Sequence, residues 1–578
     1  MTDAPPRNAK GYLTAPDHTL TGWPPGVPYI IGNEGCERFS FYGMKSILQV
    51  HLTALGVMVL LTQGIADGTV EWVETTLGRI PLLSAAARES AAQEAQYVVH
   101  LFIAGVYAFP MIGAILADRL WNKYNTILWL SLVYCAGHAV LAVGENSLEG
   151  MYLGLALIAI GSGGIKPCVS ANVGDQFGKA NWSRLERVFQ MFYFIINFGS
   201  FFATLLIPWV KEVYGTSVAF GIPGVLMFIA TVIFWTGRKK FVHVPARPGG
   251  ALGGLDFLSS AFMFMTFGSL FFTATAPLWV ILVTSGSCLA VGMVLFFARQ
   301  QRQPDDSFLP VFLYAASSFL RGERGEGRPV RAAGDDKPAS ERWLDQSRFW
   351  GAAVRRYGHA TVEGPVAVLK IISIFVMVSV FWALFDQHAS SWIRQAEVMD
   401  RTFDLPFIGA FTVLPSQVQA LNPALVMILI PFAGFVLYPG IGKLGFTMTP
   451  LRRMTIGMAI ASAAFAVVAL IQARIDGGEH VHVVWQIIPY IIMTLAEVMV
   501  SITGLEFAYS QAPKRMKSTI MGFWLLTVAL GNVLVSFLST FKGLALVDFF
   551  WTFAAFMAGA ALLFGLRAAF YRMRDYAQ

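Results

Sequence analysis

Charged side chains stand inside apolar stretches of this sequence, and four of them are close together. The segment NEGCERFSFYGMKSIL carries Glu34, Glu37, Arg38 and Lys45. Steps of three and four residues put the first three on one helix face, and Lys45 lies one heptad beyond Arg38 near the same stripe. A charge at the centre of a membrane-spanning helix costs about 2.5–3.5 kcal/mol, so such groups are rare unless paired or functional. Protonating one acid would release a base, which is a means of coupling a proton to an anionic group. The alternative is a structural salt bridge near the membrane interface.

Three further charges lie in later apolar segments. Lys166, in GSGGIKPCVSANVGDQF, needs a carboxylate partner, and the acids of the first helix are the candidates; the alternative is a side chain that snorkels to the interface. Glu497, in LAEVMVSITG, is either functional or simply a buried, hydrogen-bonded acid. Asp386, in FWALFDQHASSW, gives a weaker signal because its position is consistent with the outer end of a helix.

His100 is the one histidine of interest at this stage, because an imidazole titrates near physiological pH. Taken alone, a histidine on an apolar helix is more often a packing residue. The same caution applies to six polar and aromatic residues that become informative only in a wider pattern: Tyr42, Tyr193, Asn197, Trp382, Asn422 and Trp524.

The elements that carry these residues are membrane-spanning helices. Of the 578 residues 56% are hydrophobic and only 13% are charged, whereas soluble domains carry about 25% charged residues. A spanning helix needs roughly 20 apolar residues. This rule predicts about fourteen spans, near 28–56, 97–118, 126–144, 150–174, 187–210, 217–236, 254–273, 276–298, 366–393, 410–440, 453–473, 483–509, 518–540 and 546–569.

The spans divide into two sets of six when the pair at 254–298 is set aside, which is the layout of transporters built from two pseudo-symmetric halves. Lys and Arg gather in the connections on one side, so we expect both termini to be cytoplasmic. The predicted division is a tail at 1–27, a six-helix bundle at 28–240 with a periplasmic insertion at 57–96, an extra helix pair at 250–300, a cytoplasmic linker at 301–362 and a second six-helix bundle at 363–570. The polar stretch Ala85–Gln96 within the insertion is helix-prone, and the charged stretch 321–342 of the linker should be flexible.

Several classes of protein are disfavoured. The net charge of +7 does not indicate nucleic-acid binding, because the basic residues form short clusters between apolar segments. None of the four cysteines has a CxxC partner, so neither a disulfide framework nor a zinc site is expected. A membrane enzyme or a channel is the less favoured alternative, because the sequence contains no metal cluster, nucleotide-binding loop or nucleophile–base pair.

The motifs resemble those of a known family, the proton-dependent oligopeptide transporters of the major facilitator superfamily. NEGCERFSFYG resembles the family's ExxERFxYYG motif, GSGGIKPCVSANVGDQF its GTGGxKPxVSxxxGDQF signature, and FYFIINFGS its FYxxINxGS. FWALFDQ and GLEFAYSQAP are similar to further segments, particularly of animal members. The extra helix pair and the short connection ARIDGGEHVH resemble prokaryotic members, which implies the bacterial inner membrane.

The resemblance implies a proton-coupled symporter that imports di- and tripeptides by alternating access, driven by the proton gradient, without a cofactor and acting as a monomer in the bilayer. A relative that carries nitrate or another small anion is the alternative. The implied proton-coupling residues are Glu34, Glu37, Arg38, His100 and Asp386, with His100 ten residues before Pro110 as in animal members. The implied substrate-binding residues are Arg38, Tyr42, Lys45, Lys166, Tyr193, Asn197, Trp382, Asn422, Glu497 and Trp524.

The sequence also departs from the family pattern. Phe41 replaces a common Tyr and Lys45 a common Arg, which keeps the charge but loses the bidentate grip on a carboxylate. Ser162 replaces Thr, and Ala496 replaces the Gly before the tenth-helix acid. These departures concern peptide-length preference and pH optimum.

Overall fold

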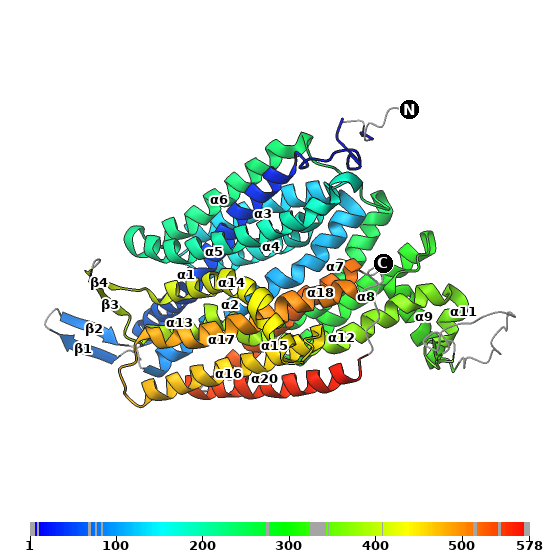
Figure 1. Ribbon diagram of the computed structural model, residues 1–578. Coiled ribbons are helices and arrows are strands. Elements are labelled where there is room, and N and C mark those ends of the chain that lie inside the picture. The colour runs from blue at the N-terminus through cyan, green and yellow to red at the C-terminus, as the bar shows by residue number, and fades with distance from the viewer. Residues whose placement is uncertain are drawn as a thin grey trace.

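Helices make up most of the computed structural model (Figure 1). It describes residues 6–8, 11–67, 71–75, 78–82, 85–272, 277–322, 343–344, 346–406, 409–511, 517–541 and 545–571. Among these residues, fourteen helical segments are long and apolar enough to cross a membrane. The predicted all-α, multi-span fold is confirmed.

The first six spans form the N-terminal half of the molecule. They are α1 (Val27–Asp67), α2 (Ala85–Ile115), α3 (Lys123–Val143), α4 (Leu148–Asp175), α5 (Leu185–Tyr214) and α6 (Thr216–Thr236). The extra pair follows as α7 (Gly250–Phe272) and α8 (Leu278–Arg302), which pack against each other while α7 also contacts α2.

The last six spans form the C-terminal half, and several of them are interrupted. Its helices are α12 (His359–Phe385), α13 (Ser391–Glu397), α14 (Leu421–Phe432), α15 (Tyr438–Lys443), α16 (Pro450–Asp476), α17 (Ile487–Glu497), α18 (Thr503–Ser510), α19 (Lys517–Ser539) and α20 (Leu546–Ala569). A 3-10 turn separates α12 from α13, and π-helical turns separate α14 from α15 and α17 from α18. The spans predicted at 366–393, 410–440 and 483–509 are therefore each interrupted by a 3-10 or π-helical turn.

Each half has its own hydrophobic core. One cluster of buried residues includes Ile47, Phe102 and Phe220 of the N-terminal half, and another includes Phe375, Phe465 and Phe553 of the C-terminal half. The two halves lie one above the other in Figure 1, with α2 packed along α19 at their boundary. The hydrophobic packing within each half is therefore largely its own.

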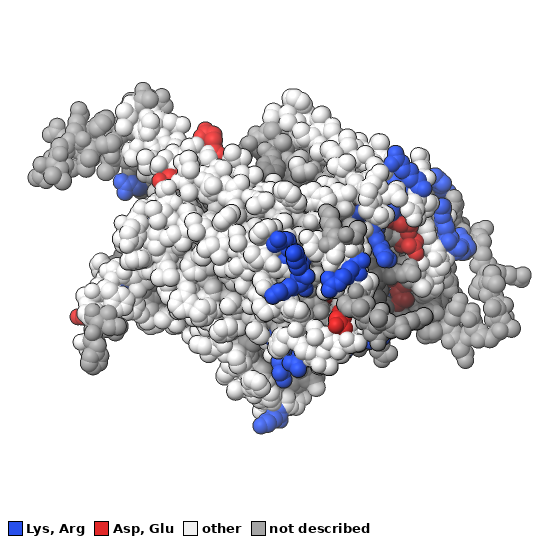
Figure 2. All heavy atoms as spheres, turned by 90° about the horizontal axis from the view of Figure 1, so that it is seen from above, with Lys and Arg blue, Asp and Glu red and all other residues white. Residues whose placement is uncertain are grey.

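The two ends of the helix bundle differ in structure and charge. Two antiparallel hairpins lie at one end, formed by β1 (Glu71–Thr75) with β2 (Gly78–Leu82) and by β3 (Thr402–Leu405) with β4 (Gly409–Thr412). We call this the hairpin end. The opposite end, where α1 begins and α9 (Phe308–Leu320) and α11 (Gly351–Tyr357) lie, is the linker end. On the face shown in Figure 2, Lys and Arg side chains lie mainly from the middle of the molecule to the linker end.

Two segments predicted as connections contain helices, and the helix-prone stretch Ala85–Gln96 is helical as expected. The insertion at 57–96 is largely helix: apolar residues continue α1 to Asp67, a hairpin follows, and the Ala-rich stretch from Ala85 is the first three turns of α2. At 1.5 Å per residue α1 is about 60 Å long, roughly twice the hydrocarbon thickness, so it projects beyond the membrane. The linker at 301–362 contains α9, α11 and the start of α12. The stretch predicted to be flexible lies outside the described residues, apart from Arg321 and Gly322.

Candidate functional site

Three charges of α1 form one bonded group. Arg38 Nε lies 2.6 Å from Glu34 Oε1 and 3.1 Å from Glu37 Oε2, and all three side chains are largely buried. Ser162 of α4 donates a hydrogen bond of 3.3 Å to Glu37 Oε1. The spacing in the sequence predicts this shared face. A guanidinium between two carboxylates leaves a single net negative charge, so adding one proton neutralises the group.

Lys166 of α4 lies beside this group but does not bond to it. Its Nζ atom is buried and makes no hydrogen bond to any described residue. It lies 4.1 Å from the centre of the Phe41 ring and 4.4 Å from that of Tyr107, while interacting electrostatically with Glu37 and Arg38. The predicted pairing of Lys166 with a first-helix acid is therefore wrong for this conformation. Arg38 already occupies both carboxylates, and the aromatic faces stabilise the ammonium instead.

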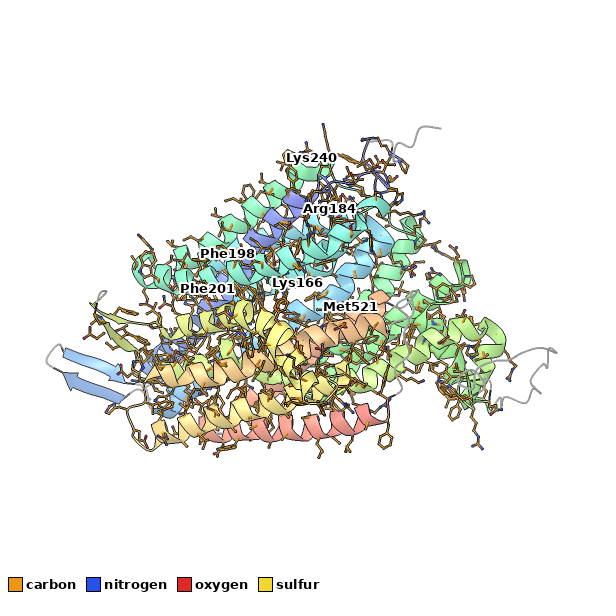
Figure 3. All side chains as sticks on the ribbon, viewed as in Figure 1. Lys166, Arg184, Phe198, Phe201, Lys240 and Met521 are labelled. Carbon is orange, nitrogen blue, oxygen red and sulfur yellow. The ribbon has the colours of Figure 1, made fainter. Side chains whose placement is uncertain are left out.

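Close helix packing fixes the position of Lys166. A Cβ atom on Gly113 of α2 would lie 2.3 Å from the carbonyl oxygen of Gly164 of α4. Small residues at such crossings let helix backbones approach closely. The GSGG run thus acts as a packing surface that holds α4 against α2, with Lys166 two residues beyond it. In the view of Figure 3, Lys166 lies at the boundary with the C-terminal half.

A second charged pair joins the two halves nearer the hairpin end. Lys45 Nζ of α1 lies 3.3 Å from Asp386 Oδ1, and the two side chains are only 6% and 5% exposed. The predicted role of Lys45 as a substrate ligand stays a prediction, and in this conformation its ammonium is paired with an acid of the other half. The reason is its depth: it lies two turns beyond Arg38, where α1 meets the C-terminal half.

His100 is bonded into the same junction. Its Nδ1–H donates to Asn532 Oδ1 at 2.7 Å, because an amide oxygen only accepts, and in the neutral ring Nε2 accepts from the Ser390 hydroxyl at 2.7 Å. Asn532 in turn donates to Asp386 Oδ2 at 2.7 Å. A continuous chain from His100 to Lys45 thus crosses between the halves. Its donors and acceptors depend on the protonation of His100 and Asp386, so a proton arriving here alters the junction.

The C-terminal half supplies a carboxylate of its own. Glu497 Oε2 accepts a hydrogen bond of 2.8 Å from Asn422 Nδ2, which also lies 3.2 Å from Thr494 Oγ1. The π-helical turn Val498–Ile502 begins directly after Glu497. Such turns often occur at functional sites, since they shift the register of the following side chains.

Two tryptophans form an apolar wall in the C-terminal half. The rings of Trp382 and Trp524 meet edge to face with centroids 6.2 Å apart, and both side chains are buried. Gly504 makes room for this wall, because a Cβ atom there would lie 2.1 Å from the Trp524 ring.

Tyrosines connect the cationic and acidic sides. Tyr42 interacts electrostatically with both Arg38 and Glu497, and Tyr193 interacts with Tyr42 and Glu497. The Tyr193 side chain is 39% exposed. Tyr42 and Tyr193 therefore lie within electrostatic range of charges from both halves. Asn197 lies one turn from Tyr193 and donates to its backbone carbonyl at 2.9 Å.

Sequence reasoning missed four residues of this site: Tyr107, Ser390, Asn532 and Thr494. Two of them left a usable signal. Tyr107 is one heptad beyond His100 on α2, and Asn532 is an isolated amide in the apolar stretch WLLTVALGNVLVSF. Tyr107 contacts Lys166 on another helix, and Asn532 contacts His100 across 432 residues of chain, so only the packed structure identifies the contacts.

The sequence profile of the POT family matches residues 124–253 and 339–547. Human solute carrier family 15 member 1 is 30% identical over 487 residues, which cover 79% of this chain and 53% of that protein. Mouse solute carrier family 15 member 2 is 29% identical over 517 residues, covering 87% of this chain and 56% of that protein. The chain thus spans about half the length of these curated relatives.

Two solved structures resemble the chain over nearly its whole length. The POT family transporter PepTSo is 39% identical, with a TM-score of 0.71, and the match covers 95% of this chain and 98% of that one. An auto-inhibited POT family peptide transporter is 38% identical, with a TM-score of 0.70, and the match covers 96% and 98%. The fold is therefore shared with membrane transporters of known architecture.

Proposed function

The chain belongs to the POT family of multi-pass membrane transporters, and on that premise we propose that it imports di- and tripeptides together with protons by alternating access. The observation that carries this proposal is the pair of opposite charges around one region: Arg38 and Lys166 on the N-terminal half, and Glu497 on the C-terminal half. A short peptide has a carboxylate at one end and an ammonium at the other. The two halves thus offer a cation and an anion to a zwitterion of that kind.

The side chains of the peptide would face apolar and aromatic walls. Trp382 and Trp524 supply such a wall, and Tyr42 and Tyr193 border it. Burial of an apolar side chain against such a surface is favourable whatever its exact shape, because the hydrophobic effect is non-directional. A transporter of peptides in general needs this tolerance, whereas a carrier of nitrate or another small inorganic anion has no use for Glu497.

The proton step follows from the bonding around Arg38. Protonation of Glu37 or Glu34 removes one of the carboxylates that hold the guanidinium, which frees Arg38 for the peptide carboxylate. Lys166 is already free of hydrogen bonds to the described residues. Loss of the proton on the other side of the membrane restores the ion pairs, which then compete with the substrate and release it. The proton gradient supplies the free energy: one charge that crosses a membrane potential of 100 mV releases about 2.3 kcal/mol. In this proposal no cofactor is needed.

The hairpin end faces the periplasm of a bacterium in this proposal, with both termini in the cytoplasm. Basic residues gather at the linker end, as they do on the cytoplasmic side of membrane proteins (Figure 2). Hydrogen bonds between the halves gather nearer the hairpin end, for example Gln419 to the Ser46 carbonyl at 3.1 Å and Gln417 to the Leu205 carbonyl at 2.9 Å. The conformation is thus one that is closed toward the periplasm. Each chain contains both halves and acts as a monomer.

Uptake of labelled dialanine into proteoliposomes tests the proposal. We expect accumulation only with an inward proton gradient, and competition by tripeptides but not by single amino acids or nitrate. Nitrate competition without peptide competition would favour the small-anion alternative, and a flux that neither saturates nor responds to the gradient would indicate a channel. The proton assignment fails if Glu37→Gln transports with undiminished proton drive.

A further inference from the structure

Arg394 of α13 is a buried cation that finds its hydrogen-bond acceptors on the opposite half of the protein. Its side chain is 8% exposed. One guanidinium nitrogen donates to Gln96 Oε1 at 3.0 Å and another to Glu89 Oε1 at 2.5 Å. Both acceptors belong to α2 of the N-terminal half, while Glu397 of its own helix interacts with it electrostatically.

The contact continues the junction around His100 by one more helical turn. Gln96 precedes His100 by four residues on α2, and Arg394 follows Ser390 by four residues in the C-terminal half. Residues four apart lie one above the other on a helix. Because Ser390 is the residue directly before α13, α2 contacts the start of α13 in two successive layers. The His100 layer lies deeper in the molecule, and the Arg394 layer lies at the hairpin end.

The two acceptors lie on the segment Ala85–Gln96 of α2, which the sequence presents as a polar insertion without an evident role. The helical extension places this segment in contact with the other half. It carries Glu89 and Gln96 on one face, which reaches α13 of the other half. Glu94, between them in sequence, is exposed instead.

We propose that Arg394, Glu89 and Gln96 form a latch that holds the two halves together at the hairpin end and so sets the balance between the two orientations of the transporter. The latch rests on the proposed alternating access. When the halves separate at the hairpin end, α2 leaves α13, and Arg394 loses both acceptors at once. The three side chains act on transport through this balance, as positioning residues, without touching the substrate.

The latch has one part that is sensitive to salt and one that is not. The Glu89 side chain is 44% exposed, so ions on the periplasmic side screen its attraction to Arg394. The bond to Gln96 involves a neutral acceptor and is buried, since Gln96 is 1% exposed. Raising the ionic strength therefore weakens the latch without abolishing it.

Hydrogen exchange of the full chain in lipid nanodiscs tests the latch directly. The readout is the exchange of the amides in α13 and in the first turns of α2, which become accessible when the hairpin end opens. A hydrogen bond to a charged group contributes enough that Arg394→Gln should raise this exchange about 10- to 150-fold. Glu89→Gln should raise it less, because the exposed partner is already partly screened.

The matched control is Glu94→Gln, which removes an acid from the same helical segment without touching Arg394. The decisive variant exchanges the charges, Glu89→Arg with Arg394→Glu, and should return exchange to within about threefold of wild type. The latch is refuted if Glu89→Gln behaves like Glu94→Gln, or if the exchanged pair opens as much as either single variant. Should Arg394→Gln fail to fold, Glu89→Gln and the salt titration of the wild-type protein still decide the question.

The two proposals fail in different ways. If the wild-type protein does not accumulate dialanine, the proposed function fails, whatever the exchange shows. If it transports peptide and the Arg394 and Glu89 variants leave both exchange and the rate of uptake unchanged, the latch alone fails.

Discussion

The role of Glu497 can be isolated by changing the protein and the peptide together. In the wild-type structure Asn422 Nδ2 donates to Glu497 Oε2 at 2.8 Å. Glu497→Gln keeps the side-chain size and an oxygen that can accept this bond, but it removes the charge. N-propionylalanine has the shape of dialanine without its ammonium group. If Glu497 binds the peptide ammonium, each change alone removes the same interaction, so their effects should not add.

The magnitude follows from the type of contact. A hydrogen bond to a charged group contributes about 1.5–3 kcal/mol in a protein. A factor of ten in affinity corresponds to about 1.4 kcal/mol. The ratio of the affinity for dialanine to that for N-propionylalanine should therefore be about 10- to 150-fold larger in wild type than in Glu497→Gln. The side chain is partly buried, so solvent screening leaves most of this difference in place.

The assay is competition against labelled dialanine counterflow in proteoliposomes without a proton gradient, which separates binding from proton drive. Glu506→Gln is the matched control, since Glu506 is an exposed acid in the neighbouring helix α18. An equal preference for dialanine in wild type and Glu497→Gln would refute the reasoning, because the acid would then have no contact with the ammonium.

Three further predictions concern other parts of the molecule. Asp386→Asn leaves the Lys45 ammonium buried without its counter-charge, which costs the closed form about 3 kcal/mol. The ratio of open to closed molecules should therefore rise roughly 150-fold. Double electron–electron resonance between labels at the hairpin end measures this ratio, and an unchanged distance distribution would contradict the prediction. Phe41→Leu and Lys166→Met should be coupled by about 1–2 kcal/mol in thermal unfolding if the ring stabilises the ammonium, and strictly additive losses would exclude that contact. The Asp400 carboxylate accepts the first backbone N–H of β3 at 3.0 Å, and this bond holds the pKa of Asp400 below its ordinary value. Its stabilisation is therefore present above the unfolded-state pKa and lost as the pH falls through the lower folded-state pKa, so β3 amides should lose protection on acidification, whereas constant protection would argue against the cap.

The membrane fold follows from the sequence because its signal is local. A bilayer demands about 20 apolar residues in a row for each span, and this pattern needs no knowledge of distant contacts. The bonding of Glu34, Glu37 and Arg38 is local too, because steps of three and four residues within one helix fix their distances. The motif similarity around Lys166 and Glu497 located the candidate site before any coordinates.

The sequence did not predict which charges of one half pair with which charges of the other half. Lys45 pairs with Asp386, and Arg394 with Glu89, across more than 300 residues of chain. Which of several cations meets which acid depends on how two separately folded bundles are placed against each other. The predicted partner of Lys166 was wrong for this reason. Arg38 is paired with both carboxylates of the first helix, and the packing at the GSGG run places the Lys166 ammonium over two aromatic rings.

Local interruptions of helices were also decided by the tertiary structure. Apolar composition predicts a helix through Glu497 but does not reveal the π-helical turn that follows it, since that turn depends on how α17 packs against its neighbours. The chain by itself thus determined which residues lie in the membrane and which charges share a helix face. Only the folded protein decided which charges neutralise one another, because a buried ion binds the counter-charge that packing brings within reach.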